Sequence, residues 1–212
     1  MQITRRSILS IVGATAMTPS VAWADSAAAG AAAGTTPPTE TERSIGSASA
    51  PVTIMEFFSL TCTHCAEFAT VTMPQVKPNL VDTGKLRIIY HDFPLDQVAL
   101  KAAQVARYLP ANEYYPFVEA LFASQNDWAF QQGEDYHASI FKYAALAGMD
   151  QATYEKAWND TALAQWILSG QKEAEETFHI DATPSFVLNG KTYPGAMDYD
   201  AFAALVTKAA GG

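Results

Sequence analysis

Apolar positions in the first half of the chain form two compact runs that predict buried strands. Residues 52–58 read Val-Thr-Ile-Met-Glu-Phe-Phe, and residues 86–90 read Leu-Arg-Ile-Ile-Tyr. Short runs rich in β-branched and aromatic side chains are typical of strands covered on both faces. Between them, residues 62–80 have the character of a helix that Thr61 can cap and that Pro74 should bend. The pattern of this part of the chain is therefore β-α-β.

Beyond Asp96 the apolar positions change to the spacing of amphipathic helices, and this pattern continues to about Phe178. Gly148 should end one of these helices, and Asp150 can cap the next. We expect the apolar side chains at this spacing to pack into a core rather than to bind a cofactor. They are Val98, Ala102, Val105, Ala106, Leu109, Phe117, Leu121, Phe122, Ile140, Tyr143, Ala144, Ala147, Trp158, Leu163, Trp166 and Ile167.

Strand character returns towards the end of the chain. Residues 184–188 form an apolar run, and the pair Asn189-Gly190 is a strong signal for a two-residue hairpin turn. Residues 191–193 would pair back as the second strand of the hairpin. A last helix is expected over 199–210, with an aspartate as its cap.

The order of these elements predicts an α/β, thioredoxin-like fold with a helical domain inserted between a β-α-β half and a β-β-α half. We expect the core over 51–95 and 179–210 and the helical insertion over 96–178. Residues 25–50 are rich in Ala, Gly, Ser, Thr and Pro, and we expect a flexible lead-in outside the core. No dimerisation domain is evident, which favours a monomer.

The N-terminal residues 1–24 resemble an export signal. Arg5 and Arg6 supply a charged start, an apolar stretch too short to span a bilayer follows over 8–17, and residues 22–24 (Ala-Trp-Ala) match a cleavage site. The two arginines also resemble a twin-arginine signal, so export in an unfolded or a folded state stays open. Either route leads to an oxidising compartment, where a dithiol can be kept as a disulfide.

The charge balance excludes some partners. The formal net charge is −9, and 49% of the residues are hydrophobic, which is enough for a sizeable core. An acidic protein is a poor ligand for nucleic acid and for anionic membrane surfaces. We therefore expect neither as a partner.

The only two cysteines of the chain lie in the run Cys62-Thr63-His64-Cys65 at the start of the predicted helix. A disulfide across two residues constrains little chain, so this pair is expected to react rather than to hold the fold. The helix N-terminus should stabilise a thiolate at Cys62, the nucleophile. Cys65 should be the more buried, resolving thiol, and the imidazolium or the N–H of His64 can further stabilise the thiolate.

Three further features bear on this pair. Glu56 lies in an apolar strand, where it is either on a solvated edge or buried near the thiols with a raised pKa that suits proton transfer. Thr183-Pro184 begins a strand. Sequence alone does not favour a cis peptide bond between these two residues. Neither a zinc site nor a haem attachment motif is present, and we expect no cofactor and no metal.

On these residues the chain resembles the DsbA-like thiol-disulfide oxidoreductases of bacterial cell envelopes. The resemblance covers most of residues 50–208 and is carried by the runs 56–59 (Glu-Phe-Phe-Ser), 62–65 and 182–190 (Ala-Thr-Pro-Ser-Phe-Val-Leu-Asn-Gly). It implies that Glu56 is a buried acid near the dithiol. It also implies that Pro184 is a cis-proline facing the disulfide, and that Thr183 tunes the redox poise and contacts the substrate.

The resemblance implies a periplasmic enzyme that introduces disulfide bonds into exported proteins and is reoxidised by a quinone-linked, DsbB-like membrane partner. Its substrates would be reduced or unfolded exported proteins with free thiols. Many members have Pro where this chain has Thr63, and many dedicated oxidases have Val where it has Thr183. An isomerase or reductase kept reduced by a membrane reductant is therefore the alternative, with copper handling through Cys62, His64 and Cys65 as a third.

Overall fold

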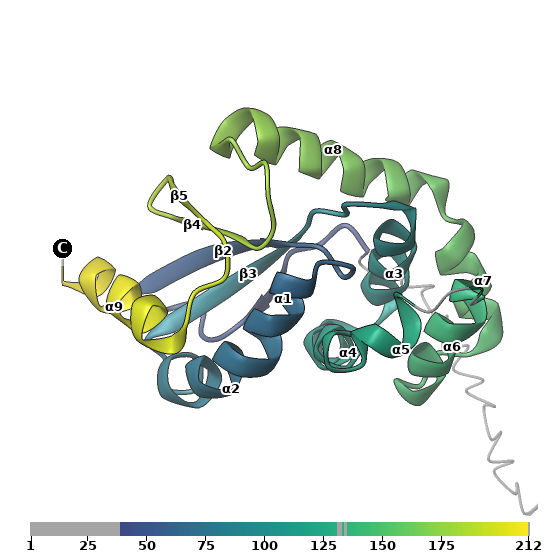
Figure 1. Cartoon of the computed structure of the whole chain (residues 1–212), viewed down its shortest axis with the longest axis horizontal. Helices are drawn as coiled ribbons and strands as arrows, with labels where there is room; N and C mark the ends of the chain where they lie inside the picture. The colour runs from purple at the N-terminus through teal and green to yellow at the C-terminus, as the bar shows by residue number, and fades with distance from the viewer. Residues whose placement is uncertain (1–38, 131–132, 134, 212) are drawn as a thin grey trace, which may run out of the picture. The chain divides into compact units, whose positions relative to one another are not determined.

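A five-stranded mixed sheet organises the part of the chain that this computed structural model describes, residues 39–130, 133 and 135–211 (Figure 1). The expected export signal lies outside these residues. The strand order is β1-β3-β2-β4-β5, with β2 parallel to β3 and the other pairs antiparallel. The strands are β1 (Arg43–Ile45), β2 (Val52–Phe58), β3 (Leu86–Asp92), β4 (Ser185–Leu188) and β5 (Lys191–Pro194).

Strand pairing brings three distant segments to one end of the sheet. In the parallel pair, Phe58 at the end of β2 lies opposite Asp92 at the end of β3. In the antiparallel pair, Phe57 lies opposite Ser185 at the start of β4. Three segments therefore meet at the same end of the sheet: the residues after β2, the residues after β3, and residues 183–184 before β4.

One prediction about the N-terminal segment is wrong. Within the expected lead-in 25–50, residues 43–45 form the edge strand β1, where Arg43 is opposite Tyr90 of β3. Arg43 is only 1% exposed. The Arg-Ser-Ile run does not alternate between hydrophobic and polar residues, so the sequence does not predict a strand there. Its place in the sheet depends on the burial of the arginine against the helical insertion.

The helix that follows β2 is continuous over residues 63–81 and includes two π-helical segments. It comprises α1 (Thr63–Glu67), η1 (Phe68–Thr72), α2 (Met73–Val76) and η2 (Lys77–Val81). Pro74 and Pro78 each lie in the first positions of a segment, so the helix changes its winding around them instead of ending. Thr61 does not cap this helix, because its hydroxyl donates to Asp96 Oδ2 at 2.7 Å.

The helical insertion lies between β3 and β4, as the order of elements predicted. Aspartates at 135, 150, 160 and 198 each cap a helix by accepting from the backbone N–H three residues on, and Asp96 does the same. The remaining helices are α3 (Gln97–Tyr108), α4 (Ala111–Ala123), α5 (Gln125–Trp128), α6 (Tyr136–Leu146), α7 (Gln151–Asn159), α8 (Thr161–Phe178) and α9 (Tyr199–Ala210).

Helices cover both faces of the sheet. In Figure 1, α1, α2 and α9 lie along one face, α8 runs across the other, and α3–α7 gather beside one end. The ring of Phe68 lies 4.7 Å from Phe186 and 5.4 Å from Phe202, which joins the cysteine-bearing helix, β4 and α9. Phe58 meets Phe122 of α4 edge-on at 5.8 Å. The end of β2 is thus packed against the insertion.

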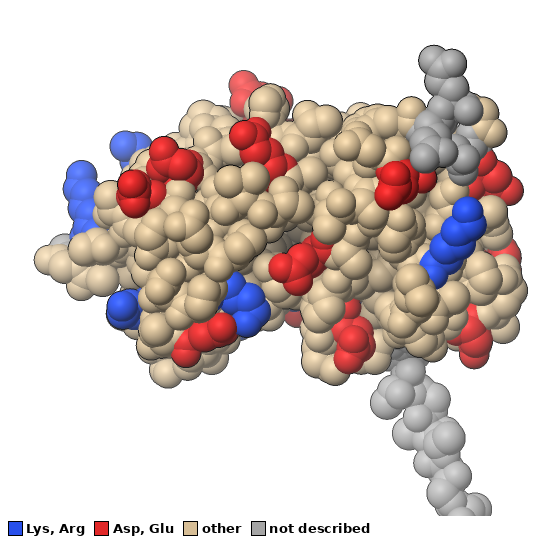
Figure 2. Space-filling view, turned by 60° about the horizontal axis from the view of Figure 1, so that its bottom comes forward, with Lys and Arg blue, Asp and Glu red and all other residues tan. Residues whose placement is uncertain are grey.

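The surface agrees with the acidic composition. Figure 2 shows Asp and Glu side chains spread across the visible face, whereas most of the visible Lys and Arg lie towards its left end. Within residues 39–130, 133 and 135–211, no helix has the length and apolar character needed to cross a membrane.

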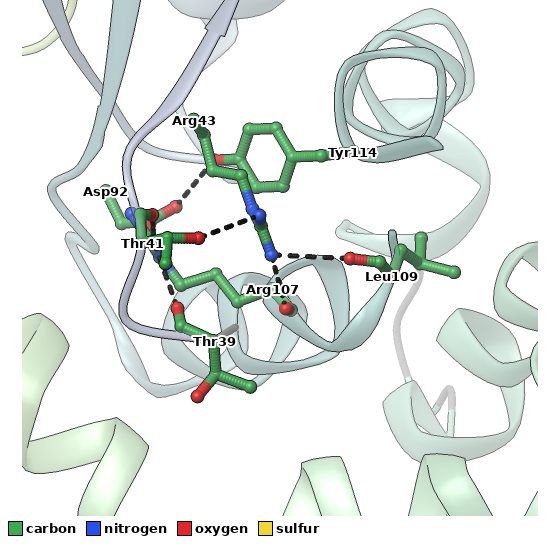
Figure 3. Close-up of polar contacts among 7 residues, drawn as sticks. All are labelled: Thr39, Thr41, Arg43, Asp92, Arg107, Leu109 and Tyr114. Atoms are coloured by element: carbon green, nitrogen blue, oxygen red, sulfur yellow. Dashed lines mark hydrogen bonds and ion pairs between the residues drawn. The ribbon is translucent and has the colours of Figure 1, made fainter. Parts of the chain in front are cut away.

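A buried ionic cluster joins the sheet to the insertion (Figure 3). Arg107 Nε of α3 is paired with the Asp92 carboxylate at the end of β3, and Tyr114 of α4 donates to Asp92 at 3.2 Å. Arg43 Nη2 of β1 donates to the carbonyls of Arg107 at 2.7 Å and Leu109 at 3.3 Å. Two buried guanidinium groups thus depend on one carboxylate for their charge balance.

Replacement of Asp92 by alanine should cost about 3–5 kcal/mol of unfolding free energy, because it leaves Arg107 and Arg43 buried without a counter-charge. Urea unfolding measures the loss. Glu42→Ala is the matched control, since its ion pair with Arg87 is partly exposed and should contribute about 0–1 kcal/mol. Equal losses from the two variants would contradict this role for the cluster.

Candidate active site

The two cysteines lie at the end of the sheet where the three segments meet. Cys62 is the N-cap residue of α1, with φ −80° and ψ 120°, and Cys65 lies in the first turn. Both are free thiols, and they are 8% and 0% exposed. The expected order of burial, with Cys65 the deeper thiol, is confirmed.

Hydrogen-bond donors surround the Cys62 sulfur. Its Sγ accepts from the Cys65 backbone N–H at 3.4 Å, so the sulfur itself takes the place of a capping oxygen. The pKa of Cys62 is lowered to about 5, chiefly by a hydrogen bond from the Cys65 thiol. The Thr183 side chain and the backbone N–H groups of Cys65 and His64 add to the lowering, and burial opposes it. Cys62 is thus a thiolate at neutral pH.

The Cys65 thiol has the opposite character. Burial is the main cause that raises its pKa well above the ordinary value, and the hydrogen bond to Cys62 raises it further. The Cys62 thiolate and the more deeply buried, protonated Cys65 thiol form a pair that can exchange disulfides. The attacking and resolving roles expected for Cys62 and Cys65 fit this difference.

The peptide bond between Thr183 and Pro184 is cis, as the resemblance implied. The Thr183 carbonyl oxygen lies 3.2 Å from Cys62 Sγ and can accept from it when Cys62 is protonated. The Thr183 hydroxyl lies beside the same sulfur and has no hydrogen-bond partner elsewhere among the described residues, so it can donate to the thiolate. This segment and the cysteine loop lie face to face.

Glu56 is buried beneath the dithiol, which decides between the two alternatives that the sequence left open. It is 3% exposed and lies opposite Tyr90 and Phe186 on the neighbouring strands. Burial raises the pKa of Glu56 to about 8, and its charge helps to raise the pKa of Cys65. Its Oε2 has no hydrogen-bond partner within the described part of the chain. A proton-transfer role stays a prediction.

The His64 imidazole is exposed and pairs with a carboxylate on the same helix. Its side chain is 72% exposed, and Nδ1 lies 3.4 Å from Glu67 Oε2. The backbone N–H of His64, rather than its ring, is what helps to lower the pKa of Cys62. A role for the ring in substrate exchange stays a prediction.

Two further histidines lie on β3 and at the end of α8. His91 stacks on Phe57 with ring centroids 4.7 Å apart and is half-buried. His179 is the C-cap residue of α8. Among the described residues, no three His, Cys, Asp or Glu side chains cluster in an arrangement that could hold a metal ion.

Gln125 is a site residue that the sequence did not reveal. This residue of α5 is 5% exposed, and its Nε2 donates to the carbonyls of Leu60 at 2.8 Å and Cys62 at 3.0 Å. A glutamine in a polar stretch of the insertion carries no motif, and its contacts cross more than 60 residues of chain. Only the tertiary structure brings it to the cysteine loop.

A family model described as Thioredoxin matches residues 38–208. The chain therefore belongs to the thioredoxin family. The crystal structure of α-DsbA1 from Wolbachia pipientis is 28% identical, with 81% of this chain and 92% of that chain covered and a TM-score of 0.75. The crystal structure of BdbD from Bacillus subtilis shares the fold at 20% identity, with 81% and 94% covered and a TM-score of 0.71. These findings confirm the thioredoxin-like fold and the resemblance to DsbA.

A protein of Rickettsia felis named "Putative protein-disulfide oxidoreductase" is 25% identical over 166 residues, which cover 78% of this chain and 59% of that protein. The chain spans between 53% and 59% of the length of this and four similarly named rickettsial relatives.

The raised pKa of Glu56 predicts a pH-dependent stability of the reduced protein. The folded state holds the Glu56 proton more tightly than the unfolded chain does. The contribution of protonated Glu56 to the free energy of unfolding is therefore lost as pH rises from about 4.5 to about 8. Glu56→Gln should therefore gain stability over the natural chain as pH rises through this window, measured by urea unfolding at each pH. Glu176→Gln, at a side chain 69% exposed, should follow the natural chain. A constant difference for Glu56→Gln would contradict the burial of an ionisable acid.

Proposed function

We propose that the protein is a thiol-disulfide oxidoreductase that introduces disulfide bonds into exported proteins through Cys62 and Cys65. The observation that carries the proposal is the contrast between the two thiols. Cys62 has a pKa lowered to about 5 at the mouth of the site, and Cys65 is a fully buried thiol with a raised pKa. The names of the relatives support the same reaction class.

The reaction begins from the Cys62–Cys65 disulfide. A substrate thiolate attacks Cys62 Sγ, a mixed disulfide forms, and Cys65 leaves as a thiolate that takes a proton, for which Glu56 is the nearby buried acid. A second substrate thiolate then attacks the substrate sulfur of the mixed disulfide. Cys62 leaves as a thiolate, so the substrate loses two electrons and the dithiol gains them.

The low pKa of Cys62 favours the oxidase over the isomerase or reductase alternative. A stable thiolate stabilises the reduced form, so the disulfide becomes a stronger oxidant. Thr63 and Thr183 differ from the residues of many dedicated oxidases, which keeps the isomerase or reductase as the second candidate. Thr183 bears directly on this choice, because its side chain, where many dedicated oxidases have Val, forms a hydrogen bond with the Cys62 sulfur.

We place this reaction in the periplasm, with residues 1–24 as the export signal and reduced exported proteins as substrates. A DsbB-like, quinone-linked membrane partner would accept the electrons and restore the disulfide. The protein would act as a monomer.

The reduction potential tests the direction of electron flow. Equilibration with glutathione should give a value well above the roughly −270 mV of thioredoxin and towards the roughly −120 mV of the strongest oxidases of this kind. Alkylation of the thiols in freshly quenched cells should find the pair mostly as a disulfide. A potential in the thioredoxin range together with a mostly reduced pair would replace the oxidase by the isomerase or reductase.

Separate replacement of the two cysteines distinguishes their roles. Cys62→Ala should abolish oxidation of a reduced substrate protein, because no sulfur remains at the mouth of the site. Cys65→Ala keeps the Cys62 thiol but lacks the resolving thiol, so it should accumulate mixed disulfides visible on non-reducing gels. Mixed disulfides that form through Cys65 in the Cys62→Ala variant would reverse the assignment.

A further inference from the structure

The helical insertion reaches the redox site through one buried side chain. Gln125 Nε2 donates to two carbonyls of the cysteine loop, those of Leu60 at 2.8 Å and Cys62 at 3.0 Å. Leu60 is 1% exposed and Gln125 5%, so water does not replace these hydrogen bonds readily.

The Cys62 carbonyl that Gln125 holds is part of the helix start. It also accepts the hydrogen bond from the Ala66 N–H at 3.1 Å. Its orientation sets the peptide plane between residues 62 and 63, and so the direction in which the first N–H groups of α1 face. The Cys65 N–H that lies 3.4 Å from the Cys62 sulfur belongs to this same turn. Gln125 thus acts on the backbone that carries the donors to the sulfur.

Gln125 is itself held rigidly. It begins α5, whose last residue Trp128 is fully buried and donates from its indole nitrogen to the Leu121 carbonyl at 2.8 Å. The neighbouring Phe122 packs edge-on against Phe58 at the end of β2. The packing of α5 therefore fixes the position of the Gln125 amide. Its two hydrogen bonds require no rearrangement of the insertion.

We propose that Gln125 is a positioning residue for the Cys62 thiolate, through which the helical insertion sets how strongly the dithiol site oxidises its substrates. This inference rests on the proposed function for its consequence, but its physical effect on the sulfur is measurable without any substrate protein. The amide does not touch the reacting atoms, so it acts only through the loop.

Loss of the Gln125 amide should raise the pKa of Cys62. Without its two hydrogen bonds the Leu60 and Cys62 carbonyls are left buried with fewer donors, and the loop turns to satisfy them. The helix N–H groups then face the sulfur less well, and the thiolate is less stable. The pKa of Cys62 rises, and the reduced form loses stability relative to the disulfide.

The insertion contains a matched control. Gln104 of α3 is fully buried, and its Nε2 also donates to two carbonyls, those of Ala157 at 3.1 Å and Asp160 at 2.6 Å. Both acceptors lie inside the insertion. Gln104→Met therefore removes the same kind and number of hydrogen bonds as Gln125→Met without touching the cysteine loop.

The experiment compares Gln125→Met, Gln104→Met and the natural chain by thiolate absorbance against pH and by equilibration with glutathione. Gln125→Met should raise the pKa of Cys62 by about one unit. It should also lower the equilibrium constant for oxidation of glutathione about tenfold, which is a shift of about 30 mV in the reducing direction. Gln104→Met should lose stability in urea and leave both redox quantities unchanged.

If Gln125→Met fails to fold, Gln125→Asn, which keeps the amide on a shorter stem, must shift both quantities in the same direction. Redox values equal to those of the natural chain, or an equal shift in Gln104→Met, would overturn the proposal. A natural chain that titrates as described but does not oxidise a reduced protein would remove the proposed function and leave the effect of Gln125 in place.

Discussion

The placement of the Cys62 sulfur at the N-cap of a helix is the interaction on which the site depends. A helix start has N–H groups without partners in the helix, and an oxygen side chain usually accepts from them. Here the sulfur accepts from the Cys65 N–H, and Thr61, which could have been the cap, donates to Asp96 instead. The same N–H that completes the helix start adds to the lowering of the pKa of Cys62, whose chief cause is the hydrogen bond from the Cys65 thiol.

Segments far apart in the chain hold this sulfur in place. The parallel pairing of β2 with β3 and the antiparallel pairing with β4 bring the cysteine loop and Thr183 together. The insertion adds the Gln125 amide on the third side. The ionic cluster around Asp92 fixes the insertion against the sheet, and so links the site to a region that contains none of its chemistry.

Glu56 shows that the site is not arranged for stability alone. A carboxyl group that is buried without a full set of hydrogen bonds holds its proton to a pH of about 8, which costs stability when it ionises. The same burial places a proton donor and acceptor near Cys65, whose own pKa is raised. The proton transfer to Cys65 proposed above would require an ionisable group of this kind.

The sequence by itself determined the order of strands and helices, the hairpin at Asn189-Gly190, the reactive pair Cys62 and Cys65, and the resemblance that implied the cis bond before Pro184. These depend on local periodicity, turn chemistry and motifs, which are readable along the chain. The tertiary structure alone decided the burial of Glu56, the strand at Arg43, the orientation of the His64 ring and the contact from Gln125. Each of these depends on which distant segments pack together, and a contact between residues 62 and 125 leaves no periodic trace in the sequence.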